Sequence, residues 1–102
     1  MMNMTTNYDE QPAENAGNDK GLSWYRATEL TNDLLREMIS YYARAISSEE
    51  NTPSPNIDTI NQLEKKQQEI MAINNNPASF ASLEQMNKII AVLGPLVKKM
   101  YA

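Results

Sequence analysis

The feature that most constrains the fold is a run of apolar side chains in residues 24–46, spaced three or four residues apart and uninterrupted by glycine or proline. Side chains with this spacing lie on one face of an α-helix, so the run predicts an amphipathic helix. Ser23 precedes it, and a serine hydroxyl accepts a hydrogen bond from a first-turn amide, which predicts an N-cap there. The apolar face is broader than a coiled-coil seam and favours contact with two neighbours.

A second helix is expected after the prolines at positions 53 and 55, because proline lacks the amide donor that a helix interior requires. The expected start is near Ser54 or Asn56, with apolar positions at Ile57, Ile60, Leu63, Ile70 and Met71. Only polar residues separate Leu63 from Ile70, and among them Gln67 falls on the apolar stripe. We expect Gln67 to be partly buried, as a structural residue or as a polar contact that fixes register or engages a partner.

A third helix follows the turn formed by residues 74–77, which read Asn-Asn-Asn-Pro. Ser82 with Gln85 fits a capping box, and Asn76 followed by proline is an alternative start. The apolar stripe then comprises Leu83, Met86, Ile90, Leu93, Val97 and Met100. Gly94 and Pro95 interrupt the stripe without changing its phase, so we favour a kinked continuation over a separate fourth helix.

These elements predict an all-α fold, a three-helix antiparallel bundle whose third helix is kinked or split at Gly94-Pro95. A chain of 102 residues has room for one domain, which we place at residues 22–102. Residues 1–21 are polar and acidic, with few large apolar side chains, and cannot offset their ordering entropy by burial. A disordered N-terminal tail is therefore expected.

The composition argues against catalysis. The chain has no cysteine and no histidine, so it lacks thiolate chemistry, the usual general base and the usual metal ligands. No phosphate-binding loop, calcium loop or nucleophile motif is present. Glu29, Asp33 and Glu37 are spaced to share one helix face, which is interpreted as a charged outer surface. We expect no catalytic residues, no cofactor, no metal and no small-molecule substrate.

The charge distribution bears on the choice of partner. The net charge of the chain is −4, of which residues 1–20 contribute −3 and the remainder only −1. A nearly neutral body lacks the basic excess that attracts phosphate, so nucleic acid is disfavoured as a partner, and an anionic membrane likewise. No stretch is apolar enough to span a bilayer and no signal peptide is recognisable. With the absence of cysteine, this predicts a cytoplasmic location.

Aromatic residues gather on the first helix together with arginines. Tyrosine, tryptophan and arginine dominate protein interface hot spots, and neighbouring positions on a helix point about 100° apart, so part of this set should stay exposed. The alternative is that the tryptophan and one tyrosine belong to the core and the others cover its rim. The predicted partner-binding residues are Trp24, Tyr25, Arg26, Tyr41, Tyr42 and Arg44.

The sequence therefore predicts a small non-catalytic module that binds another protein and acts by steric occupation. A bacterial plasmid or prophage accessory factor, such as an inhibitor, antitoxin, immunity or anti-host protein, would act in this way. The methionine-rich core is thin for its helix length, which favours a homodimer.

Two other functions remain open. One is a dimeric nucleic-acid-binding transcriptional regulator that pools Arg26, Arg44 and the lysine pairs at positions 65–66 and 98–99. The other is a secretion-system component or chaperone. The order of helix, proline-marked turn and helix over residues 22–70 resembles needle and rod subunits of type III secretion. This resemblance implies an export role and assigns no residue.

Overall fold

The computed structural model describes the backbone of residues 16–101 and the side chains of residues 21 and 23–101. Within these residues the chain forms three α-helices and one short 3-10 turn, and no strand. The elements are α1 (Ala16–Glu50), α2 (Ile57–Asn74), η1 (Pro77–Phe80) and α3 (Leu83–Met100). The all-α, three-helix prediction is confirmed. The part of the expected tail at residues 1–15 lies outside the described residues.

The predicted start of the first helix is wrong. α1 begins at Ala16, and Ser23, the expected N-cap, lies within the helix with an exposed side chain. A glycine weakens a helix by about 1 kcal/mol and does not stop it as a proline does, so Gly21 is tolerated inside α1. The helix of 35 residues is about 52 Å long.

The caps of the later elements follow the sequence closely. The side chain of Asn56 accepts a hydrogen bond from the amide of Thr59 at 3.1 Å and caps α2. Both proposed starts of the third segment are used, since Asn76 caps η1 and Ser82 caps α3. The Ser82 hydroxyl accepts from the Gln85 amide at 3.0 Å. The two alternatives thus describe consecutive elements.

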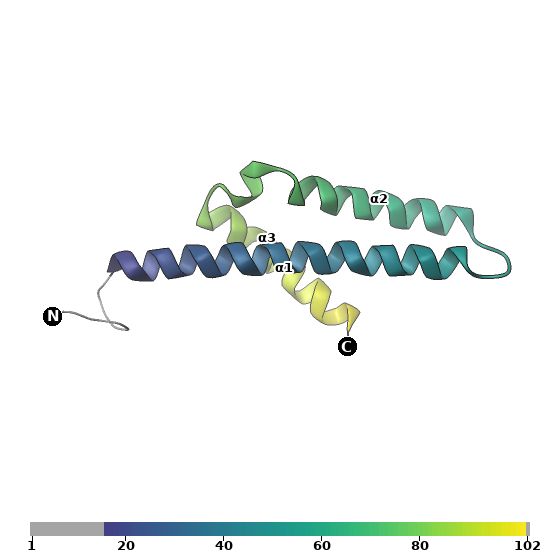
Figure 1. Ribbon diagram of the computed structural model, residues 1–102, viewed down its shortest axis with the longest axis horizontal. Coiled ribbons are helices and arrows are strands. Elements are labelled where there is room, and N and C mark those ends of the chain that lie inside the picture. The colour runs from purple at the N-terminus through teal and green to yellow at the C-terminus, as the bar shows by residue number, and fades with distance from the viewer. Residues whose placement is uncertain (1–15, 102) are drawn as a thin grey trace.

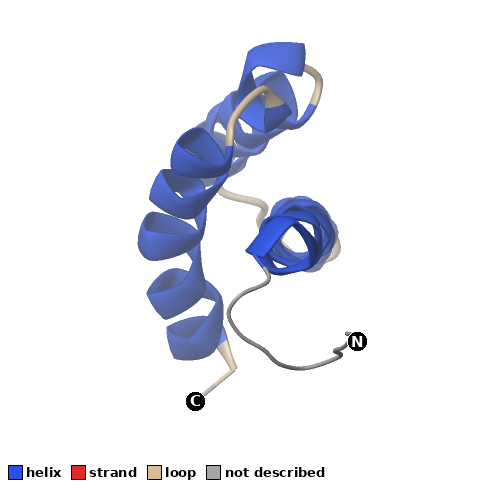
Figure 2. Ribbon diagram, turned by 90° about the vertical axis from the view of Figure 1, so that its left-hand side faces the viewer, coloured by secondary structure: helices blue, strands red, loops and turns tan. Residues whose placement is uncertain are grey.

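α1 is the central helix of the fold. Figure 1 shows α2 returning antiparallel to α1, whereas α3 passes behind α1 at an oblique angle and emerges on its other side. Figure 2 looks along α1 and shows α3 beside it and α2 above it. α1 packs against both helices, while α2 and α3 make little direct contact. The bundle is therefore more open than three parallel helices would be, because α2 and α3 diverge from η1.

The core forms where the helices meet on α1. Leu35 is fully buried and packs in one cluster with Met38, Ile70, Ile89 and Leu93, which come from all three helices. Burying such a side chain stabilises the fold by about 1.5 to 3 kcal/mol. One shared cluster thus holds both α2 and α3 to α1.

α3 runs without a break through Gly94 and Pro95. Figure 2 shows it curving gently with its concave side toward α1. Pro95 is exposed, and the buried residues Met86, Ile89 and Leu93 lie on the opposite side, toward α1. Packing of this apolar face stabilises the helix despite the missing amide donor, so the predicted continuation of the third helix is confirmed.

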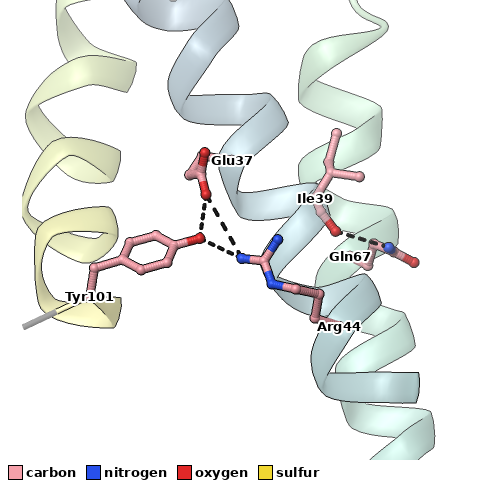
Figure 3. A network of polar contacts seen from close by, with 5 residues as sticks. All are labelled: Glu37, Ile39, Arg44, Gln67 and Tyr101. Carbon is pink, nitrogen blue, oxygen red and sulfur yellow. Dashed lines mark hydrogen bonds and ion pairs between the residues drawn. The ribbon is translucent and has the colours of Figure 1, made fainter. Parts of the chain in front are cut away.

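Two polar contacts fasten the outer helices to α1 (Figure 3). The side-chain amide of Gln67 on α2 donates to the carbonyl oxygen of Ile39 at 3.2 Å and is partly buried, as its position on the stripe predicted. At the end of α3 the Tyr101 hydroxyl donates to the Glu37 carboxylate and accepts from the Arg44 guanidinium. Arg44 and Glu37 also form an ion pair at 3.8 Å.

Candidate protein-binding groove

An apolar groove lies between α2 and α3, and α1 forms the floor of one of its ends. The end of α2 and the start of α3 meet at η1, and the two helices diverge from there (Figure 1). Their facing sides therefore make little direct contact. We call it the α2–α3 groove. It comprises two hollows, each lined by residues from both α2 and α3.

The wide end of the groove is a hollow of about 420 Å³ that all three helices line. Its floor comes from α1, and its walls come from α2 and α3. The lining residues are Met38, Tyr41, Tyr42, Leu63, Lys66, Leu96, Lys99 and Met100.

The narrow end lies nearer η1 and is a hollow of about 250 Å³. It is lined by Ile73, Lys88, Ile89, Val92 and Leu93. Val92, Leu96 and Met100 follow one another at four-residue steps along α3 and therefore connect the two ends on one wall. The groove spans about two helical turns of α3, or roughly 11 Å.

The walls expose apolar surface that the fold itself does not cover. Val92 is 63% and Leu96 44% exposed, and both lie at the edge of the buried face of α3. Large apolar side chains gathered in a concave site are typical of places where a partner binds. The groove can therefore bury a complementary apolar surface.

Charged groups of one sign line the groove at both ends. Lys66 stands on the α2 wall and Lys99 on the α3 wall at the wide end, and neither forms an ion pair with another described residue. Lys88 at the narrow end lies 4.0 Å from the carboxylate of Glu84. Two ammonium groups thus flank the apolar floor of the wide end.

Tyr41 and Tyr42 form the aromatic part of the groove. Their rings meet edge to face, with centroids 5.6 Å apart and planes at 77°. Burial raises the pKa of Tyr42, and Tyr41 and the carboxylate of Glu69 add to the effect. The Tyr42 hydroxyl is therefore neutral over the physiological range and can donate a hydrogen bond.

The six residues predicted for partner binding do not form one surface. Tyr41 and Tyr42 line the groove, whereas Arg44 is engaged with Glu37 and Tyr101 outside it. Trp24 lies about 25 Å from Tyr41 along α1. The aromatic residues of the first helix are thus divided between its two ends.

The other three predicted residues lie near the start of the described side chains of α1. Trp24 is 43% and Tyr25 60% exposed, and the Tyr25 hydroxyl donates to the Glu29 carboxylate at 3.1 Å, a contact that raises the pKa of Tyr25. Arg26 borders a separate hollow of about 380 Å³ between α1 and the start of α3, which Leu30 and Ile90 also line. This hollow mixes polar and apolar groups and is a weaker candidate than the groove.

Sequence reasoning missed the α2 and α3 walls of the groove. Lys66 and Lys99 were noticed only as members of lysine pairs, and Leu96 was not among the apolar positions expected on the stripe. The available signal was the width of the apolar face of α3, where Val92 and Leu96 extend the stripe to one side. A broad face indicates a second neighbour, and none is supplied by the described residues.

No protein family, curated protein or solved structure matches this chain. Among the helices of the described residues, none combines the length and the apolar character needed to cross a membrane. The described side chains also contain no group of three or more acidic residues placed to hold a metal ion.

Proposed function

We propose that this protein is a small non-catalytic module that binds another protein by receiving a helix of that partner in the α2–α3 groove. The observation that carries the proposal is the exposed apolar wall of α3, at Val92 and Leu96, beside the hollow over Met38 and Tyr42. A helix laid into a groove between two others buries its apolar face against both walls. In this arrangement the module completes a four-helix arrangement with its partner.

The proposed mode of action is steric. A partner helix held in the groove has its apolar face covered. That face can then no longer pack against the other components of the partner's own complex. An intracellular inhibitor, antitoxin, immunity or anti-host factor of a bacterial plasmid or prophage would act in this way, and this remains the class of protein that we favour.

The test is capture from a bacterial lysate by the immobilised full chain and by variants. Leu96→Glu places a charge on the apolar wall and should abolish capture of a specific partner, while Val92→Glu provides an independent second variant. Ile57→Glu is the matched control, because Ile57 is 63% exposed and is not among the residues that line the groove. Unchanged circular dichroism in all three proteins shows that they are folded.

The result that contradicts the proposal is equally defined. If Leu96→Glu captures the same partner as the parent protein, and the double variant Trp24→Ala with Tyr25→Ala does not, the binding surface is the part of α1 around Trp24 and Tyr25. Binding of a nucleic acid duplex that weakens steeply with salt would instead support the regulator.

A further inference from the structure

The chemistry of the groove also indicates which kind of helix it takes. We infer that the occupant is an amphipathic helix of a partner protein whose apolar row is flanked by acidic residues. This inference rests on the proposed function and specifies the partner of the same site.

The spacing of the walls sets the apolar row of the occupant. Val92, Leu96 and Met100 are four residues apart on α3, and Leu63 lines the facing wall on α2. An occupant helix meets such a row with apolar side chains at positions i, i+4 and i+7 or i+8, over about two turns. The edge-to-face pair of Tyr41 and Tyr42 lies beneath this row at the wide end.

The lysines on the two walls determine which charged residues should flank the apolar row of the occupant. Lys66 and Lys99 lie on opposite walls and pair with no described carboxylate, so an occupant with glutamate or aspartate on both sides of its apolar row meets an ammonium group on each side. Opposing charges nearby are Glu84, which is paired with Lys88, and Glu69 on α2. Glu69 acts on Tyr42 and offsets part of the positive charge at the wide end, where two lysines line the hollow.

A second copy of the chain fits this chemistry less well. Pairing groove to groove brings two surfaces of the same positive sign together and gains no charge complementarity. The homodimer predicted from the thin core remains one of the outcomes of the test.

The experiment measures binding of designed helical peptides of about 18 residues, held helical by a side-chain staple because short free helices are marginal in water. One peptide carries a leucine row flanked by glutamates, and its counterpart carries the same row flanked by lysines. Fluorescence anisotropy with the full chain at low salt should show the glutamate peptide binding about tenfold more tightly.

Double variants test whether the preference for the glutamate peptide depends on Lys66 and Lys99. The test variant and its control have the same net charge. Lys66→Glu with Lys99→Glu should weaken binding of the glutamate peptide about tenfold, whereas arginine at both positions should retain it. Lys65→Glu with Lys98→Glu is the control, because these exposed neighbours do not line the groove, and it should change binding less than threefold.

Three outcomes overturn the inference, and they separate it from the proposed function. Equal binding of both peptides, abolished by Leu96→Glu, leaves the groove as a helix site and removes the acidic requirement. Concentration-dependent dimerisation that Leu96→Glu prevents and the peptide competes with identifies a second copy as occupant. Binding of neither peptide, with duplex DNA bound through Lys66 and Lys99, removes both proposals.

Discussion

α2 and α3 have the same length, 18 residues, and pack against the same central helix, but they differ in how much apolar surface they carry. α2 buries Ile60 and Ile70, and its middle is a run of charged and amide side chains that uses Gln67 to reach α1. α3 buries Met86, Ile89 and Leu93 and still exposes Val92 and Leu96.

The two helices also differ in where their exposed apolar side chains lie. α2 also exposes Ile57 at 63% and Met71 at 41%, but neither side chain lines the groove. α3 presents more than α1 covers, and the excess faces the groove. The proposed binding surface is therefore apolar area of α3 that the core leaves exposed.

The largest effect is expected where both outer helices depend on one residue. Leu35→Ala removes a fully buried side chain at the centre of the shared cluster and should lower the free energy of unfolding by about 3 kcal/mol. Urea denaturation followed by circular dichroism measures it. Leu96→Ala, on the exposed wall, is the comparison and should cost less than about 1 kcal/mol. Equal losses would mean that the groove wall is part of the core.

The second prediction tests whether α3 stays helical at Pro95 because its apolar face packs against α1. Pro95→Ala restores a helix amide and should raise the free energy of unfolding by about 2 kcal/mol, since a mid-helix proline costs about 3 kcal/mol and stiffens the unfolded chain by up to about 1. Gly94→Ala should add about 1 kcal/mol, because nothing lies within 4 Å of its new Cβ. A loss of stability in the Pro95 variant would show that the curvature of α3 depends on the proline.

The third prediction concerns the polar anchor of α2. Gln67→Glu removes the donor to Ile39 and places a carboxylate against a carbonyl oxygen, which should cost about 1.5 kcal/mol at pH 7. This environment raises the pKa of the introduced carboxyl in the folded state, so the loss should shrink as the pH falls through that pKa. Gln68→Glu, at an exposed neighbouring position, is the control for the added charge. Equal losses in the two variants, measured by urea denaturation at pH 7 and pH 4, would remove Gln67 as an anchor.

The smallest change in stability is expected at Tyr101, which follows the end of α3 and is exposed. The hydrogen bond to Glu37 raises the pKa of Tyr101, with Arg44 acting in the opposite direction. A tyrosine whose folded pKa is raised stabilises the fold below pH 10 and loses this contribution as the pH rises through the folded value. Tyr101→Phe should therefore be slightly less stable than the parent protein at pH 8, and the difference should shrink as the pH rises through the raised folded pKa. A difference that grows with alkalinity would exclude the contact.

Much of the fold was predictable because it depends on local signals. The apolar spacing indicated three helices, and short polar residues at Asn56, Asn76 and Ser82 cap the elements they precede. Gln67 was identified as inward-facing from its phase alone. The start of α1 was missed because a good capping residue, Ser23, can also be accommodated within a helix.

The groove was less predictable, because it is a relation between helices and not a property of one. Tyr41 and Tyr42 were identified from aromatic clustering, but Trp24 and Tyr25 were grouped with them although they lie near the other end of α1. Sequence neighbours on one helix share a surface only within a few turns.

The amino-acid sequence by itself determined the helical class, the number of helices and most of their caps, since hydrophobic spacing and capping chemistry act over a few residues. Tertiary structure decided that α3 crosses α1 obliquely and that α2 and α3 diverge from η1. It also brought Lys66 and Lys99 to the same apolar hollow. These features depend on how the apolar faces of α2 and α3, which differ in width, pack against the single apolar face of α1. That balance of burial is settled only when all three are packed together.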